Sequence, residues 1–222
     1  MTSELPLLGW WKMDEGNGKI IGDSSENGIQ GAITGPLNWD TGPFADSSAI
    51  KFEGQSYISF VYKHDQKSKL KPYIPTTNLS FSLWFSTTSQ SGGLCVVTNG
   101  NRSGYDRHIW LKNGCLNFNC WSEVNFSGKK KVNDNSWHNV IYVINENVGL
   151  RCYVDGELYA ENAKKASNFD WATTWHIGTG FKGRDSNNSC NFTGKIGNPI
   201  LFNCALDENQ VREIASGNIY NY

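Results

Sequence analysis

The sequence lacks any long hydrophobic run and any excess of one charge. Its apolar stretches are only a few residues long, far below the roughly 20 residues that cross a bilayer as a helix, so membrane insertion is not expected. The 20 Lys and Arg against 21 Asp and Glu give a formal net charge of -1, and they are scattered thinly. Because this scatter offers no basic stripe to neutralise phosphates, nucleic acid is not an expected partner.

Leader-like and zinc-binding patterns are also missing. The segment 1–6 has no charged start followed by an apolar core, which leaves either a cytoplasmic protein or a domain taken from a longer secreted chain. The six cysteines include no C-x-x-C pair and no histidine spacing typical of zinc. Cys95 and Cys152 lie in apolar or alternating runs, so we expect them to be small buried hydrophobes. The sequence leaves open whether Cys190 and Cys204 form a disulfide.

Helical periodicity is nearly absent, and short β-branched and aromatic runs recur between Gly, Asn, Asp and Ser clusters. Strands at this spacing need two packed sheets to bury their faces. Since no linker or repeat divides the chain, residues 1–222 are predicted to form a single all-β domain, a two-sheet antiparallel sandwich. The predicted strands are 7–13, 49–52, 57–60, 79–87, 94–98, 108–111, 115–121, 137–145, 149–154, 175–177 and 196–203.

One short helix is predicted near the C-terminus. Asp207 is a good N-cap, and Gln210 three residues later completes a capping-box pattern. Val211 and Ile214 give the helix an apolar face, and Gly217 ends it. Because such a helix usually seals an open edge of a sandwich core, we expect it at that place.

The clearest local signal is Asn113-Gly114 between two alternating runs, which favours a two-residue type I′ hairpin turn. The turn sets the register, in which Lys112 pairs with Cys115 and the pairing continues outward to His108 with Asn119. One face of this hairpin is then apolar and must point into the core: Ile109, Leu111, Leu116, Phe118 and Cys120. The other face carries Asp106, His108, Trp110, Asn117, Asn119 and Trp121.

This second face is the predicted ligand-binding surface, on the concave side of a curved sheet. Sugar recognition needs apolar platforms for the C–H faces of the ring and planar amides or carboxylates for its hydroxyls. Trp110 and Trp121 are candidate platforms. The candidate hydrogen-bonding partners are Asp106, His108, Asn117 and Asn119, with Tyr105 and Arg107 at the rim. The alternative is that a loop covers the patch and makes these tryptophans part of a secondary core.

Two further sets of residues are candidates for the binding surface. Trp84 lies between the inward-pointing Leu83 and Phe85, so it is expected on the outer side of its own sheet. A second rim is predicted in the loop before the final strands. It consists of Trp171, Trp175, Lys182, Arg184 and Asp185.

Three separated segments resemble the laminin-G-like domains of the concanavalin A-like lectin/glucanase superfamily. The first is W-W-K-M-D-E-G-N-G from Trp10, followed by D-S-S-E-N-G from Asp23. The second joins W-H-N-V at Trp137 to Y-V-D-G at Tyr153, and the third begins at Ile177 and includes F-T-G-K-I-G-N and A-L-D. Together they cover nearly the whole chain in the family's order, and the second pair is rather specific for the fold.

The resemblance implies a jelly roll and a binding role. It implies a secreted or cell-surface protein that binds a glycan or glycoprotein, either as an oligomer or as part of a larger multidomain protein. Members of this family often hold a structural Ca²⁺ between an N-terminal acidic loop and an acidic pair near the last strand. Asp14, Glu15 and Asp23 match the first half of that site, but Gly197-Asn198 replaces the pair, with Asn198 as the remaining ligand. Without calcium, Asp14 and Asp23 are explained as turn formers.

Catalysis is not expected from the motifs. Related glycosidases carry E-x-D-x-E, because their two carboxylates must lie roughly 5–5.5 Å apart, and this sequence has no such triplet. Asp106 and His108 alternate on one strand and form a conceivable acid/base pair, but no nucleophile accompanies them. His138 begins a strand that is apolar on both faces, so it is expected to be a hydrogen-bonded packing residue. The functions that remain are, in order, a lectin-like module, a protein-adhesion module of laminin-G type, and a glycan-active enzyme.

Overall fold

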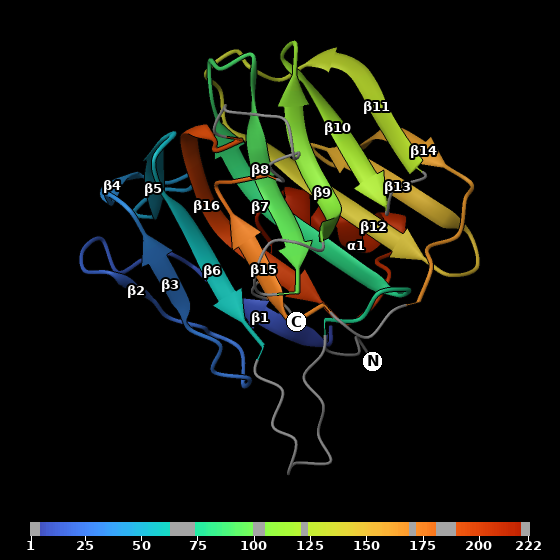
Figure 1. Cartoon of the computed structure of the whole chain (residues 1–222), viewed down its shortest axis with the longest axis horizontal. Coiled ribbons are helices and arrows are strands. Elements are labelled where there is room, and N and C mark those ends of the chain that lie inside the picture. The colour runs from blue at the N-terminus through green and yellow to red at the C-terminus, as the bar shows by residue number, and fades with distance from the viewer. Residues whose placement is uncertain are drawn as a thin grey trace.

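The computed structural model describes residues 5–62, 74–99, 105–120, 124–168, 172–180 and 190–218. Two antiparallel sheets pack face to face, and one short helix lies behind them (Figure 1). The predicted two-sheet jelly-roll sandwich is confirmed. In the described part of the chain, no helix combines the length and the hydrophobicity that crossing a bilayer requires.

We name the two sheets by what they carry. The helix-side sheet has the order β14 (Glu157–Asn162), β13 (Gly149–Val154), β12 (His138–Asn145), β7 (Leu79–Ser86), β16 (Thr193–Phe202), β5 (Ser48–Glu53) and β4 (Asn38–Thr41), and β1 (Leu7–Trp10) also pairs with β16. The hairpin sheet has the order β11 (Val124–Lys131), β10 (Cys115–Cys120), β9 (Tyr105–Lys112), β8 (Ser91–Thr98), β15 (Thr174–Ile177), β6 (Tyr57–Val61), β3 (Gly31–Thr34) and β2 (Ile20–Ile21).

Five of these strands were not predicted, and each is short, polar or at the margin of a sheet. β2, β4, β11 and β14 are the outermost strands in the sheet order, and β3 lies next to β2. Outer strands bury little surface, so their sequences need no strong apolar alternation. The predicted strands are all present, with ends shifted by a few residues.

Aromatic side chains join the two sheets at the centre of the core. Trp175 of β15 lies 5.4 Å from Phe81 of β7 and 5.8 Å from Phe60 of β6, measured between ring centroids. Trp11 packs against Phe60 with its ring tilted, at 3.8 Å between the ring centroids. The predicted apolar face of the hairpin belongs to the same continuous core cluster.

The helix α1 (Glu208–Ala215) has the predicted capping box, but it does not seal an edge of the core. It lies on the outer face of the helix-side sheet, where Val211 and Ile214 pack into a second hydrophobic cluster with Ile141 and Val143. Because β12 is apolar on both faces, its outer face also needs a cover, and α1 supplies it.

All six cysteines are free thiols. Cys95 and Cys152 are fully buried, as predicted, and burial raises the pKa of the Cys95 thiol to about 12. Cys190 and Cys204 are each only partly buried and are not joined to one another. None of the six cysteines therefore cross-links the fold through a disulfide.

His138 is the predicted hydrogen-bonded packing residue. Its Nδ1 lies 2.8 Å from Asp155 Oδ2, and its Nε2 lies 3.1 Å from Asp134 Oδ1. The hydrogen bond to Asp155 raises the pKa of His138, and Asp134 acts in the same direction against the effect of burial. Asp155 Oδ1 also accepts the backbone N–H of Asn139, so this cluster joins the start of β12 to the turn after β13.

The stability of the fold should depend on the charge of His138. Because its pKa is raised in the folded state, the imidazolium stabilises the fold fully below the ordinary pKa near 6.5, and this contribution is lost as pH rises through the folded pKa. Its size should stay below about 1 kcal/mol, because both carboxylates are more than a third exposed. As pH rises from about 6.5, urea titrations should show that the wild type loses more stability than His138→Gln, because only the wild type loses the imidazolium. If the free energy of unfolding changed with pH in the same way for the two proteins, this role of His138 would be contradicted.

Candidate ligand-binding surfaces

The predicted hairpin is formed by β9 and β10. Asn113 and Gly114 have φ values of 55° and 76°, the left-handed conformation that a type I′ turn requires. The pairing runs from Lys112–Cys115 to Ile109–Phe118, as predicted. The pairing between these two described strands ends there, so the expected pair His108–Asn119 is not formed.

Asp106 and Arg107 are not at the binding surface but are buried, with 0% and 1% of their side chains exposed. The Arg107 guanidinium is paired with the Asp106 carboxylate, and it also donates to the carbonyl oxygens of Thr76 and Ser167. Arg107 has a φ of 49°, which breaks the regular alternation at this end of β9. The rim position expected for Arg107 is wrong, because its guanidinium is held inside by Asp106 and the two carbonyls. The outward position that alternation gave to Asp106 is wrong as well, because alternation does not hold across an irregular residue.

His108 and Asn119 are also largely buried. Burial lowers the pKa of His108 to about 3, so the ring is neutral at physiological pH. Gly180 lies against His108, because a Cβ atom added to Gly180 would meet His108 Nε2. Asn119 Nδ2 donates to Asn125 Oδ1 at 3.0 Å. The segment at Gly180 therefore covers His108, although it does not make Trp110 a core residue.

Trp110 and Asn117 remain accessible. The Trp110 ring is partly exposed and stacks on His108, with 4.7 Å between the centroids and 26° between the planes. Asn117 pairs with Trp110 on one side and with Ser127 of β11 on the other, so the three side chains share one face. The carbonyl of Cys115 accepts a hydrogen bond from Asn117 Nδ2 at 3.0 Å.

β11 adds polar and cationic groups that were not predicted. Phe126 packs on the core and Gly128 lies against the ring of Tyr159, so the alternate residues Ser127, Lys129 and Lys131 face outward. We call the exposed set the hairpin surface: Trp110, Lys112, Asn117, Asn125, Ser127, Lys129 and Lys131. We described the lysines as thinly scattered in the sequence, but several of them gather on this surface. The run Lys129–Lys131 was the available signal in the sequence.

Two other aromatic candidates, Trp84 and Trp175, do not join this surface. Trp84 is on the outer face of the opposite sheet, where Phe44 packs edge-on against it at 5.1 Å. Trp175 is fully buried in the core, not at a rim. Trp121, Trp171, Lys182, Arg184 and Asp185 and the side chain of Tyr105 lie outside the described residues.

Three of the four proposed calcium ligands accept hydrogen bonds within the protein. Asp23 accepts the N–H groups of Trp10, Ser25 and Ile29 and the Ser25 hydroxyl, which uses both carboxylate oxygens. Asn198 Oδ1 accepts the Trp10 indole N–H at 2.7 Å. Glu15 Oε1 accepts the N–H of Gly22, and Asp14 is exposed. The second carboxylate oxygen of Glu15, Oε2, is buried without a hydrogen-bond partner. No group of three or more His, Cys, Asp or Glu suited to a metal lies among the described residues, and calcium at this loop stays a prediction.

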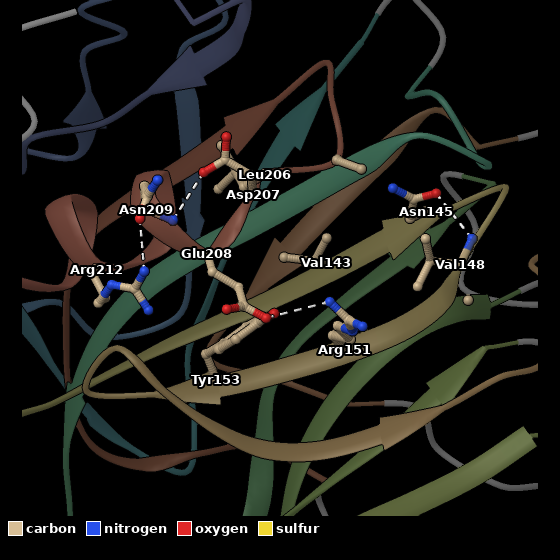
Figure 2. A pocket seen from close by; sticks show the side chains of 12 residues that line it. Val143, Asn145, Val148, Arg151, Tyr153, Leu206, Asp207, Glu208, Asn209 and Arg212 are labelled. Carbon is tan, nitrogen blue, oxygen red and sulfur yellow. Dashed lines mark hydrogen bonds and ion pairs between the residues drawn. The ribbon is translucent and has the colours of Figure 1, made fainter.

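A cavity that sequence reasoning missed lies on the helix-side sheet, between β12, β13 and the start of α1 (Figure 2). Its volume is about 490 Å³. We call it the helix-side cavity, and it is lined by Val143, Asn145, Val148, Gly149, Arg151, Tyr153, Ala205, Leu206, Asp207, Glu208, Asn209 and Arg212. Since these residues come from segments more than 50 positions apart, no local pattern could have indicated it.

The centre of the cavity is an Arg–Glu pair. Figure 2 shows the Arg151 and Glu208 side chains directed toward each other, with Tyr153 beside them. Arg151 Nη1 lies 3.6 Å from Glu208 Oε1, and Arg151 Nε lies 3.6 Å from Glu161 Oε2. Burial raises the pKa of Tyr153, which therefore keeps its proton. The cavity thus combines charged groups with an apolar floor.

Comparisons with solved structures show where else this fold occurs. Domain 4 of AbnA, a GH43 extracellular arabinanase from Geobacillus stearothermophilus solved with arabinotriose, is 19% identical, with a TM-score of 0.68 over 96% of this chain and 100% of that one. The binding domain of Paraclostridial Mosquitocidal Protein 1 is 14% identical, with a TM-score of 0.72 over 96% of this chain and 52% of that one. The binding domain of Botulinum neurotoxin DC, solved with rat synaptotagmin II, is 14% identical, with a TM-score of 0.68 over 95% and 51%.

At these identities the likeness shows the fold alone, and this chain spans about half the length of the two toxin domains. No curated protein matches the chain. The model of the concanavalin A-like lectin/glucanases superfamily matches residues 52–212, which is most of the chain. With the two antiparallel sheets and the motifs in the family's order, the chain belongs to the concanavalin A-like lectin/glucanases superfamily.

Proposed function

We propose that this chain is a non-catalytic carbohydrate-binding module that holds a glycan on the hairpin surface. The observation that carries the proposal is the Trp110 ring, which is partly exposed and fixed in place by stacking on the buried His108. A fixed aromatic face is the platform on which the C–H face of a sugar ring stacks. The arabinanase domain with this fold, solved with arabinotriose, supports the same ligand class.

Polar groups lie beside the platform. Asn117 and Ser127 continue the row that begins at Trp110, and Asn125 is in the neighbouring row, opposite Asn119. Amides and hydroxyls both donate and accept, as sugar hydroxyls require. The partner that we propose is therefore a glycan or glycoprotein, at the surface of a cell or outside it, as for the extracellular arabinanase.

The charge of the hairpin surface favours an acidic glycan. The strands β9, β10 and β11 contain four lysines and one acidic residue, Asp106. That carboxylate is buried against Arg107, so the exposed lysines of the hairpin surface face solvent without an acidic neighbour from these strands. Uronates or sulfated sugars should therefore bind more tightly than neutral ones, and added salt should weaken their binding.

The same geometry supports a non-catalytic role. Asp106 is held by Arg107, and His108, with its pKa lowered to about 3, cannot serve as a proton shuttle near neutral pH. The conceivable acid/base pair is therefore not formed. Glycosidase chemistry needs two carboxylates across the scissile bond, and the hairpin surface has none among its described residues.

Replacing Trp110 by Ala should weaken glycan binding about tenfold or more, because the stacking platform is removed. A glycan array with acidic and neutral members, followed by titration of the best ligand, measures this change. Trp84→Ala is the matched control, since Trp84 is a partly buried tryptophan on the other sheet. Chelator should leave binding unchanged, because Asp23 and Asn198 are occupied within the protein.

Two results would contradict the proposal. Equal losses in Trp110→Ala and Trp84→Ala would indicate damage to the fold and not the loss of a platform. A surface that binds no glycan but captures a protein partner through Trp110 would favour the laminin-G-type adhesion module instead.

A further inference from the structure

We propose that the helix-side cavity is a second ligand site, which binds a neutral saccharide or polyol through hydroxyls that bridge Arg151 and Glu208. This site lies on the outer face of the helix-side sheet, whereas the hairpin surface lies on the opposite sheet. The inference is independent of the proposed function, because it depends on different residues and on a different ligand charge.

The spacing of the charged groups is the first argument. At 3.6 Å, the contacts of Arg151 with Glu208 and Glu161 are longer than the roughly 2.7–3.2 Å of a hydrogen bond. Arg151 Nε is buried and has no hydrogen-bond partner. A hydroxyl can donate to the Glu208 carboxylate and accept from the guanidinium at once, so two adjacent hydroxyls fit this donor and acceptor pair.

The floor of the cavity is the second argument. Val143, Tyr153 and Leu206 are buried beneath it, and Val148 is 50% exposed at its side. Apolar side chains beneath polar ones are an arrangement that ligand pockets use to hold a ring and orient it. The C–H face of a sugar can lie on this floor while its hydroxyls reach Arg151 and Glu208.

The balance of charge selects a neutral ligand. An anion would meet Glu208 and the nearby Glu161, and a cation would meet Arg151 and Arg212. Asp207 and Asn209 are engaged in capping α1 and in a 2.7 Å hydrogen bond with Arg212. The cavity volume of about 490 Å³ lies within the roughly 300–1,000 Å³ typical of small-molecule sites.

The test uses the Trp110→Ala protein, so that the hairpin surface does not contribute. L-Arabinose, arabinotriose, D-galactose and D-glucose are titrated by calorimetry and by saturation-transfer NMR, with D-glucuronate as the acidic probe. We expect at least one neutral probe to bind and to be weakened tenfold or more by Arg151→Met. Val148→Arg should have the same effect, because it fills the side of the cavity from an exposed position. Val61→Arg, at a similarly exposed valine on the hairpin sheet, is the control.

Each other outcome overturns the inference. Binding that survives both Arg151→Met and Val148→Arg places the ligand elsewhere. A preference for D-glucuronate contradicts the charge argument. Neutral probes that bind the wild type but not the Trp110→Ala protein belong to the hairpin surface. Failure of every neutral probe removes the second site, while the glycan array on Trp110 still decides the proposed function separately.

Discussion

Replacing Arg107 by Met is expected to lower the free energy of unfolding by about 3–5 kcal/mol, as is usual when one partner of a buried ion pair is removed. The Asp106 carboxylate would remain fully buried without its guanidinium. The carbonyls of Thr76 and Ser167 would lose their donor as well, so two loops would be released from the start of β9. Urea denaturation of both proteins, followed by tryptophan fluorescence, measures the loss.

The control for this prediction is Arg212→Met, an exposed arginine on α1, for which little change is expected. Replacing both partners, as Asp106→Leu with Arg107→Met, should recover part of the loss, because no unpaired charge is then buried. If Arg107→Met were as stable as the control, the pair would not contribute to the fold.

Trp175→Ala should cost about 3–5 kcal/mol, the range for a fully buried tryptophan. Trp175 contacts Trp11 and Phe60, and it reaches Phe81 on the opposite sheet, so its removal leaves a cavity between the sheets. Calorimetry should show a marked fall in Tm.

Trp84→Ala serves as the comparison for this change, since it removes the same side chain from a partly exposed outer face. Its loss of stability should be clearly smaller. Equal losses in the two variants would show that Trp175 is not the central contact between the sheets.

Local sequence patterns were sufficient to predict the hairpin turn and the capped helix. Asn113-Gly114 set the turn and therefore the register from Lys112–Cys115 to Ile109–Phe118. The capping box of Asp207 and Gln210 placed α1 to within a residue. These features depend on neighbours a few positions away, so their physics is contained in a short segment.

Prediction of the binding surface failed where the alternation is interrupted. Asp106 was assigned to the outer face by parity, but the left-handed backbone at Arg107 interrupts the alternation, and the ion pair with Arg107 holds the Asp106 carboxylate in the interior. β11 was missed because its polar sequence carries little strand signal, and its lysines were missed with it. Each error concerns a residue whose environment is made by a distant segment.

The amino-acid sequence by itself determined the sandwich, the hairpin, the capped helix and the superfamily, because alternation, turn chemistry and motif order are properties of neighbouring residues. The tertiary structure alone decided that Trp110 is accessible while His108 is covered, and that Arg151 and Glu208 meet over an apolar floor. Burial and cavity shape are produced by segments far apart in the chain. They are therefore not contained in any local pattern.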